Sequence, residues 1–220
     1  MKPLVIFGHG EIAELADYYF REEERREVVA FTVDAAFLPG PEVLGRPMLA
    51  FETLEEHFPP EAVDLFVAIG FSRLNTLRRA KVEAAAARGY RLASYVSARA
   101  SRFKTFTPGE NQFILEDNTI QPFATIGRNV TLWSGNHIGH HARIGEDCFI
   151  ASHVVVSGGV TIGPRCFVGV NVTIRDHVTI GADCVLGAGA VVMKSLPDRS
   201  VLITPPTEIA KITSDQLRRI

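Results

Sequence analysis

Four of the seven histidines lie close together in the sequence, at His137, His140, His141 and His153. An imidazole titrates near neutral pH, so one of them could act as a general base, and several together could bind a zinc ion. A single histidine in such a place is more often a hydrogen-bonded turn residue. Which chemistry applies depends on the elements that carry these side chains.

A second group of candidate residues surrounds an apolar strand expected at 3–8. Gly8, His9 and Gly10 join this strand to a helical pattern, and Asp34 ends the next expected strand. Glycines in such a turn let backbone N–H groups approach a phosphate at the helix N-terminus, and the carboxylate suits a ribose hydroxyl. A glycine turn that serves only packing is the alternative. His9 could contact the ligand or cap the helix.

Three more candidates, Gly70, Asn75 and Arg78, follow a third apolar strand. The carboxyl ends of parallel strands meet at the edge of a sheet where ligands bind, so these residues could complete the pocket. Arg78 could equally be a solvated helix residue. Residues 1–98 are therefore expected to form a small Rossmann-like parallel α/β domain that binds one nucleotide moiety. The expected elements are strands at 3–8, 28–34, 64–70 and 91–96 and helices from Gly10 to about Arg26 and at 74–88.

The second half of the chain repeats with a period of six. An aliphatic residue occupies every sixth position from Ile114 to Val192, the residue two before it is mostly small, and the next residue is often glycine. Neither an amphipathic helix nor an ordinary strand sustains that period. Hexapeptide repeats of this kind predict a parallel β-helix, expected at 99–204. A C-terminal cap is expected at 205–220, with a short helix in SDQLRRI.

The three cysteines follow the same repeat. Cys148, Cys166 and Cys184 are 18 residues apart, and three hexads make one coil of a β-helix. Residues 18 apart should then stack roughly 4.8 Å from one another. Redox or metal chemistry is conceivable for such a column, but buried thiols usually serve as packing. We therefore expect these cysteines to be reduced, interior and inert.

The overall composition limits the classes of partner. The chain has 220 residues, 46% of them hydrophobic, and a formal net charge of −2. Such a charge creates no large field for nucleic acid or a membrane surface, so neither is expected as a partner. The N-terminal apolar run is too short for a signal peptide, and no apolar stretch could span a membrane. These features predict a cytoplasmic protein.

Gly8-His9-Gly10, Ala68-Ile69-Gly70 and the run HIGHHARIGEDCFIASHVVVSGGVTIG together resemble the family of sialic-acid O-acetyltransferases and bacillosamine-pathway sugar N-acetyltransferases. The resemblance covers nearly the whole chain. It implies a left-handed β-helix, a homotrimer and acetyl transfer from acetyl-CoA to the amine of a nucleotide-linked deoxy-amino sugar. A hydroxyl acceptor is the less expected case, and no metal is required.

The resemblance also implies catalytic residues. The family's histidine pattern, V-x-H-(D/E)-C-x-I-G, matches at His140, which would act as general base in a direct attack of the amine on the thioester. The chain departs from the pattern at His141, which stands where relatives have a carboxylate. A backbone N–H of the coil could stabilise the oxyanion.

Residues for the cofactor and the sugar follow from the same resemblance. Relatives hold the pantetheine arm in grooves between subunits, and glycines on the β-helix would leave such a groove here. Trp133 stands at a corner where glycine is common, and would be either a trimer contact or a wall of the sugar site. The residues expected to bind the cofactor are His153, Gly158, Gly159, Gly187 and Ala188.

Two other functions compete with acyl transfer. A γ-type carbonic anhydrase uses the same β-helix and binds zinc through three histidines, but that family has no N-terminal nucleotide domain. His141 and His177 are 36 residues apart, and roughly 9.6 Å at the usual strand spacing is too far to share a metal. The second alternative is a non-catalytic trimer that binds a sugar nucleotide.

Overall fold

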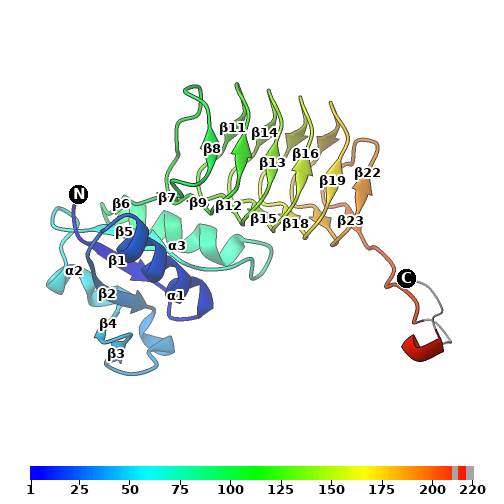
Figure 1. Ribbon diagram of the computed structural model, residues 1–220. Helices are drawn as coiled ribbons and strands as arrows, with labels where there is room; N and C mark the ends of the chain where they lie inside the picture. Colours follow the sequence, from blue (N-terminus) through cyan, green and yellow to red (C-terminus); the bar gives the residue numbers. More distant parts are fainter. Residues whose placement is uncertain (210–212, 217–220) are drawn as a thin grey trace.

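The computed structural model describes residues 1–209 and 213–216. An α/β domain is followed by a β-helix whose coils extend away from it, and the C-terminal tail leaves the last coil (Figure 1). This arrangement confirms the expected fold class, a small Rossmann-like sheet followed by a left-handed parallel β-helix.

The N-terminal sheet has six strands in the order β3-β4-β2-β1-β5-β6. All neighbouring strands are parallel except β3 and β4, which form a hairpin that the sequence analysis did not anticipate. The strands are β1 (Leu4–Phe7), β2 (Val28–Val33), β3 (Glu42–Val43), β4 (Arg46–Ala50), β5 (Asp64–Val67) and β6 (Arg91–Leu92).

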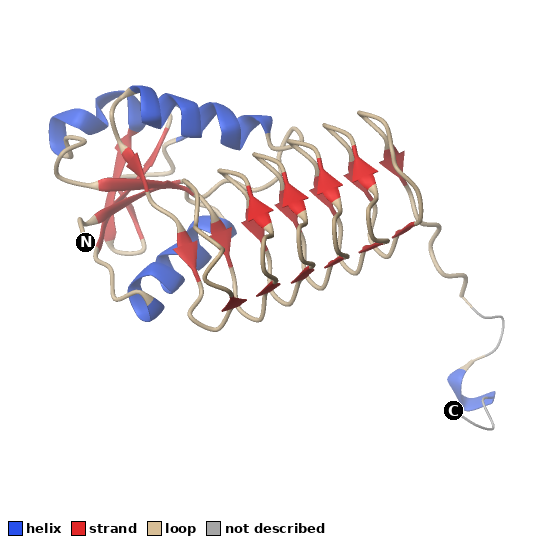
Figure 2. Cartoon of the chain, turned by 90° about the horizontal axis from the view of Figure 1, so that it is seen from above, coloured by secondary structure: helices blue, strands red, loops and turns tan. Residues whose placement is uncertain are grey.

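Helices cover both faces of this sheet (Figure 2). The apolar side chains of β1 alternate, so that Leu4 and Ile6 pack with α1 on one face while Val5 and Phe7 pack with α3 on the other. A π-helical segment, Tyr19–Glu23, extends α1. The helices are α1 (Glu11–Tyr18), α2 (Leu54–His57) and α3 (Thr76–Ala87), with 3-10 turns at Ala35–Phe37, Phe51–Thr53 and Ser214–Gln216.

The β-helix is built from strands of two residues, and from β9 to β22 each ends on the aliphatic residue of the hexapeptide repeat. These strands are β9 (Phe113–Ile114), β10 (Thr119–Ile120), β11 (Thr125–Ile126), β12 (Thr131–Leu132), β13 (His137–Ile138), β14 (Arg143–Ile144), β15 (Phe149–Ile150), β16 (Val155–Val156), β17 (Thr161–Ile162), β18 (Phe167–Val168), β19 (Thr173–Ile174), β20 (Thr179–Ile180), β21 (Val185–Leu186) and β22 (Val191–Val192).

The β-helix begins earlier than the expected boundary at residues 98–99. The strand expected at 91–96 is two strands: β6 closes the N-terminal sheet, and β7 (Tyr95–Val96) already pairs with β9. β8 (Ser101–Arg102) pairs with β10 in the same 18-residue register. The aliphatic count missed this coil because Arg102 takes the position of an aliphatic residue. At the other end, β23 (Val201–Leu202) pairs with β21.

Three parallel sheets form the faces of the β-helix. Sheet 1 contains β7, β9, β12, β15, β18, β21 and β23; sheet 2 contains β8, β10, β13, β16, β19 and β22; sheet 3 contains β11, β14, β17 and β20. Partner residues in neighbouring coils are 18 apart, as Phe149 and Phe167 illustrate. The repeat's aliphatic side chains fill the interior, and the three cysteines join them with no exposed surface. The predicted interior position of the cysteine column is therefore confirmed.

The glycines that follow the aliphatic residues are explained by the close approach of the coils and not by backbone freedom. The left-handed conformation recurs every sixth residue, at a position that residues such as Asn129, His141 and Asp183 also occupy. Gly145 and Gly163, which directly follow an aliphatic residue, have no positive φ. A Cβ atom at either would lie 2.7 Å from the backbone nitrogen of the next coil. Glycine is required there because the coils approach closely.

The C-terminal cap lies partly outside the described residues. Of the segment expected to form a short helix, Ser214–Gln216 make a single 3-10 turn. Residues 217–220 fall outside the described part of the chain.

The close approach of the coils predicts that Gly163→Ala destabilises the β-helix. The new Cβ would meet the backbone of Gly181 and Ala182 at 2.7 Å, and overpacking of this kind costs about 2 kcal/mol of unfolding free energy. Denaturant unfolding measures the change. Arg175→Ala is the matched control, because Arg175 holds the same turn position on another edge and is exposed. Equal stability of both variants and the wild type would contradict the explanation.

Candidate active site

The carboxyl ends of β1, β2 and β5 enclose a cavity of about 380 Å³. Of the residues expected to bind a nucleotide, four line it: Gly8, His9, Gly10 and Asp34. The cavity walls are otherwise largely apolar.

The geometry of the glycine turn gives the two glycines different roles. Gly8 has a φ of 129°, and a Cβ there would lie 2.8 Å from the carbonyl oxygen of Ala68. Gly10 is the N-cap of α1, with open space where its Cβ would be. The turn thus exposes the start of α1, whose free N–H groups and dipole favour an anion.

An ion pair between Asp34 and Lys81 lines this cavity. Asp34 accepts a hydrogen bond of 2.6 Å from the ammonium group of Lys81 on α3. Lys81, Phe37 and Leu77 also line the cavity, and the sequence analysis missed them. Lys81 and Leu77 lie one helical turn apart on α3, a spacing that could have signalled a common face toward the strand ends.

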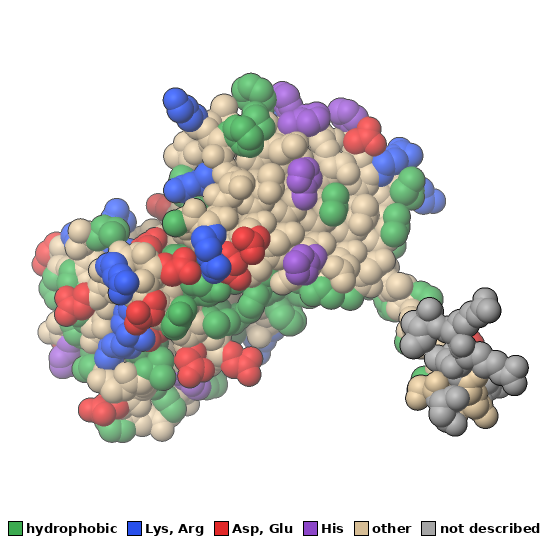
Figure 3. Space-filling model, in the orientation of Figure 1, with side chains coloured by type: hydrophobic (Ala, Val, Ile, Leu, Met, Phe, Trp, Pro, Cys, Tyr) green, Lys and Arg blue, Asp and Glu red, His purple; other side chains and the backbone are tan. Residues whose placement is uncertain are grey.

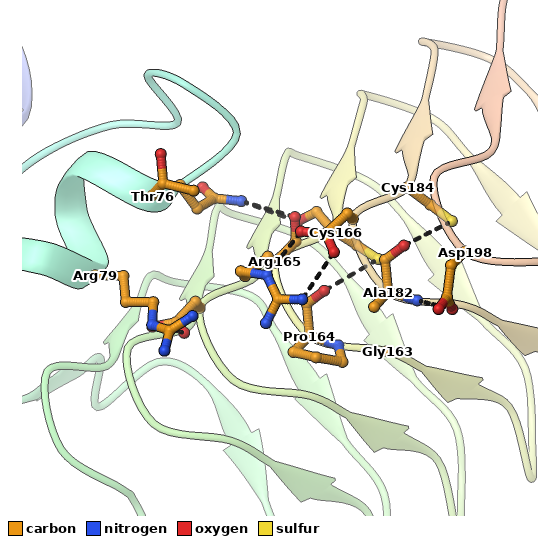
Figure 4. A network of polar contacts seen from close by, with 12 residues as sticks. Thr76, Arg79, Gly163, Pro164, Arg165, Cys166, Ala182, Cys184 and Asp198 are labelled. Carbon is orange, nitrogen blue, oxygen red and sulfur yellow. Dashed lines mark hydrogen bonds and ion pairs between the residues drawn. The ribbon is translucent and has the colours of Figure 1, made fainter.

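Arg78 and Asn75 were expected to complete the pocket, but the structure buries both elsewhere. Arg78 is 1% exposed and Asn75 fully buried, between α3 and the β-helix. The amide of Asn75 donates to the carbonyl of Cys166 at 3.2 Å. Figure 4 shows the start of α3, marked by Thr76, beside the turn of Arg165 and Cys166. Gly70 lies beside Ile12 and next to the cavity wall.

The guanidinium of Arg78 joins the two domains. It donates to the carbonyl oxygens of Asn129, Asp147 and Cys148 in the β-helix and to that of Gly70 after β5, at 3.1–3.2 Å. Burial lowers the pKa of Arg78 to about 10, while the charge of Asp147 acts in the opposite direction. The group therefore remains protonated at neutral pH, and its donors satisfy carbonyls that would otherwise be buried without partners.

His140, the expected general base, lies in the turn between β13 and β14. Its ring is exposed, and its backbone N–H donates to the side-chain oxygen of Gln121 at 2.8 Å. A Cβ at Gly158 in the next coil would lie 2.6 Å from Cε1 and Nε2 of the His140 ring. Gly158 therefore provides the space in which this imidazole rests.

His141 adopts the left-handed turn conformation, with a φ of 59°. Its Nδ1 lies 3.2 Å from Nδ1 of His140, within hydrogen-bonding distance. On its other side the His141 ring packs on Phe123, with 4.9 Å between the ring centroids. The two imidazoles are thus a contacting pair.

The residues expected to bind the cofactor fall on two different edges of the β-helix. Gly158 and Gly159 share the edge between sheets 2 and 3 with His140. His153, Gly187 and Ala188 lie on the edge between sheets 1 and 2. Within one chain these groups are separated by the width of sheet 2.

A second cavity, of about 420 Å³, lies between the loop after β5 and sheet 1. Trp133 and Ala188 both line it, together with Phe71, Phe149 and Phe167. The indole N–H of Trp133 is buried and has no hydrogen-bond partner among the described residues. Trp133 does not lie beside His140, because Trp133 occupies the edge between sheets 1 and 2 and His140 the edge between sheets 2 and 3.

The two halves of the candidate site are far apart in one chain. The N-terminal domain packs on sheet 1 and its flanking turns, through Arg78 and through Phe71 on Phe167. His140 occupies the edge between sheets 2 and 3, opposite sheet 1. Histidines gather along the edge of the β-helix farthest from the N-terminal domain (Figure 3).

Within the described residues there is neither a group of side chains suited to a metal ion nor a helix suited to a membrane. No three His, Cys, Asp or Glu side chains in the described residues are placed to hold a metal ion. No helix in this part of the chain combines the length and apolar character needed to cross a bilayer.

Comparison with known proteins places the chain in a family. The bacterial transferase hexapeptide (six repeats) family matches residues 123–158 and 159–194. PerB from Caulobacter crescentus, solved with CoA and GDP-perosamine, is 30% identical with a TM-score of 0.81, over 91% of this chain and 93% of PerB. The chain belongs to the hexapeptide-repeat sugar N-acetyltransferases. It is accordingly an acyltransferase.

Two further structures extend the comparison. A histidine-to-asparagine mutant of perosamine N-acetyltransferase from the same organism, also with CoA and GDP-perosamine, is 29% identical with a TM-score of 0.83, covering 96% of this chain and 98% of that one. The acetyltransferase domain of PglB from Neisseria gonorrhoeae shares the fold at 22% identity, with a TM-score of 0.62 over 91% and 96% of the two chains. A search of curated proteins gives no match.

The buried guanidinium predicts that Arg78→Met uncouples the domains. Several buried carbonyls would lose their donor, at a cost of about 3 kcal/mol of unfolding free energy. Two measurements report the effect: thermal unfolding, and the protease sensitivity of the 69–75 loop that precedes α3. Arg79→Met is the matched control, since Arg79 is half-buried and its ion pairs with Glu83 and, at 3.8 Å, with Asp147 contribute little. Equal losses in both variants would argue against the interdomain role of Arg78.

Proposed function

We propose that this protein transfers an acetyl group from acetyl-CoA to the amine of a nucleotide-linked deoxy-amino sugar. The observation that carries the proposal is the similarity, over nearly the whole of both chains, to perosamine N-acetyltransferase structures containing CoA and GDP-perosamine. Such a reaction needs a nucleotide site and a proton acceptor. The cavity beside Gly8 and Gly10 suits the nucleotide, and the exposed imidazole of His140 suits the proton.

The nucleotide would occupy the cavity at the strand ends. Its diphosphate suits the start of α1, where Gly10 leaves free backbone N–H groups and His9 stands beside them. Asp34, held by Lys81, suits a ribose hydroxyl or a base N–H. The apolar walls formed by Phe37 and Leu77 suit a nucleobase.

The proposed chemistry uses His140 as the proton acceptor. The sugar amine attacks the thioester carbonyl, and Nε2 of His140 takes the amine proton as the C–N bond forms. A backbone N–H of the coil would stabilise the oxyanion. Collapse of the tetrahedral intermediate breaks the C–S bond, and the proton on His140 passes to the departing CoA thiolate. No covalent enzyme intermediate is needed.

We further propose that the active site forms between protomers of a homotrimer. Within one chain the nucleotide cavity lies on the side of sheet 1, whereas His140 lies on the opposite edge. A neighbouring protomer that packs the edge between its sheets 1 and 2 against the edge carrying His140 would bring its nucleotide cavity toward that histidine. The same arrangement would place Gly158 and Gly159 of one protomer across a groove from His153, Gly187 and Ala188 of another, as a shared pantetheine site.

The proposed compartment is the cytoplasm. Cys148, Cys166 and Cys184 are all free and buried. Thiols without disulfides are usual in a reducing compartment.

Removal of the imidazole tests the proposed base. His140→Ala should lower the turnover of acetyl-CoA with a GDP-linked 4-amino sugar by at least about 10²-fold, the usual scale for a lost general base. Release of free thiol measures the rate, and sedimentation checks that the oligomeric state is unchanged. A variant with near-normal turnover would remove His140 from the mechanism.

Mixed trimers test the shared site. Gly10→Leu fills the nucleotide cavity without a steric clash, since open space surrounds the position of its Cβ. Separately, the Gly10→Leu and His140→Ala proteins should both be inactive. Co-expressed in equal amounts, they should regain about a quarter of wild-type activity, because one site in four pairs an intact cavity with an intact neighbouring histidine. Failure of the mixture to regain activity would contradict a site shared between protomers.

A further inference from the structure

The hydrogen bond between His140 and His141 can form with either residue as the donor, but only one choice leaves His140 able to accept a proton from the substrate. The two Nδ1 atoms lie 3.2 Å apart, so one nitrogen donates its proton and the other accepts it. If His141 donates, the proton of neutral His140 is on Nε2, and that atom cannot act as a base. If His140 donates, its Nε2 carries a free electron pair.

The surrounding structure holds the pair in place. Cε1 and Nε2 of the His140 ring lie nearest Gly158, and Nδ1 is the ring nitrogen within hydrogen-bonding distance of His141. The ring of His141 packs against Phe123 at an interplanar angle of 34°, and its backbone N–H donates to the carbonyl of Pro122 at 3.3 Å. Each ring therefore has one further neighbour besides the other ring: Gly158 for His140 and Phe123 for His141.

We propose that His141 is a positioning residue that accepts the Nδ1 proton of His140, so that Nε2 of His140 is the free base. This inference rests on the proposed acetyl transfer and assigns a neutral partner to its base. On proton transfer from the amine, His140 becomes an imidazolium that still donates to His141, and no proton moves on to His141. The proton later leaves Nε2 with the CoA thiol.

A neutral partner has a consequence that a carboxylate would not have. A carboxylate beside an imidazole favours its protonated form by direct charge attraction, whereas a neutral imidazole only accepts a hydrogen bond. A carboxylate in place of His141 should therefore favour the protonated form of the neighbouring imidazole more than His141 does. The acid limb of the pH–rate profile reports this difference.

Few other charges face the pair. On the preceding coil Gln121, Pro122 and Phe123 carry no charge, and on the following coil Gly158 and Gly159 have no side chain. The nearby ionisable groups are Arg143, Lys104, Asp176 and His177. Arg143 follows the turn, and Lys104 precedes Thr105, whose hydroxyl accepts a hydrogen bond from the backbone N–H of Phe123. Asp176 and His177 lie two coils after the histidine pair, and the His177 ring rests over Gly159. Lys104 and Asp176 hold the turn position of His140 two coils before and after it, and His177 holds that of His141, so none of them lies in an adjacent coil and substitution of His141 alone changes the immediate partner.

Three substitutions of His141 test the proposal. His141→Phe keeps an aromatic ring on Phe123 but removes the acceptor, and Phe123 itself shows that phenylalanine is accommodated at this left-handed position. It should lower kcat about 10-fold or more and leave the KM values unchanged. His141→Asn retains an acceptor oxygen and should restore most of the rate.

His141→Glu supplies the charge that His141 lacks. It should move the acid limb of kcat upward by about one pH unit, the scale of one exposed charge at contact distance. An unshifted acid limb, or a His141→Phe enzyme as fast as the wild type, would overturn the proposal.

A measurement without turnover separates this proposal from the proposed function. Nitrogen-15 NMR of the unliganded protein at pH 8 should find the proton of His140 on Nδ1 in the wild type and mainly on Nε2 in His141→Phe. An Nε2–H tautomer in the wild type would overturn the assignment of His141. Wild-type protein with the expected tautomer but no acetyl transfer would instead count against the proposed function alone.

Discussion

The spacing between coils is the constraint on which the rest of the structure depends. Each coil lies one hydrogen-bonded strand from the next, so a turn residue has its counterpart 18 positions away directly beside it. The choice of side chain in one coil therefore limits the choice in its neighbour. Gly145 and Gly163 show the simplest form of this limit, because backbone of the next coil occupies the place of a Cβ.

The same spacing shapes the candidate catalytic edge. Three imidazole rings rest where the neighbouring coil has a glycine: Gly158 beside His140 and Gly159 beside His177 on this edge, and Gly135 beside His153 on the edge between sheets 1 and 2. The glycines predicted to form a cofactor groove thus also provide room for rings. Whether a given glycine serves the pantetheine or the histidine cannot be read from residue type, since both uses require the missing Cβ.

The sequence was most informative where one residue type meets one physical requirement. Burial of an aliphatic residue at every sixth position defines the β-helix, and the glycine turn after β1 correctly located a cavity at the strand ends. It was least informative at the domain interface. Arg78 and Asn75 lie on the helix that follows β5, so their position favoured the ligand edge. Only the packing of α3 on the β-helix, a contact between residues far apart in sequence, reveals that they face the other way.

The interface also explains why the cavity and the histidine are separated. Arg78 binds carbonyls on both the 69–70 loop and the coils of Asn129 and Asp147, so it fixes the cavity at the strand ends against sheet 1. A rigid attachment on that side directs the opposite edge, with His140, away from its own cavity. In the proposed site, the geometry that stabilises each chain therefore keeps the cavity and His140 of that chain apart. Assembly with a second copy becomes part of the proposed mechanism, because rotation of the domains about this interface would break buried, charge-assisted hydrogen bonds.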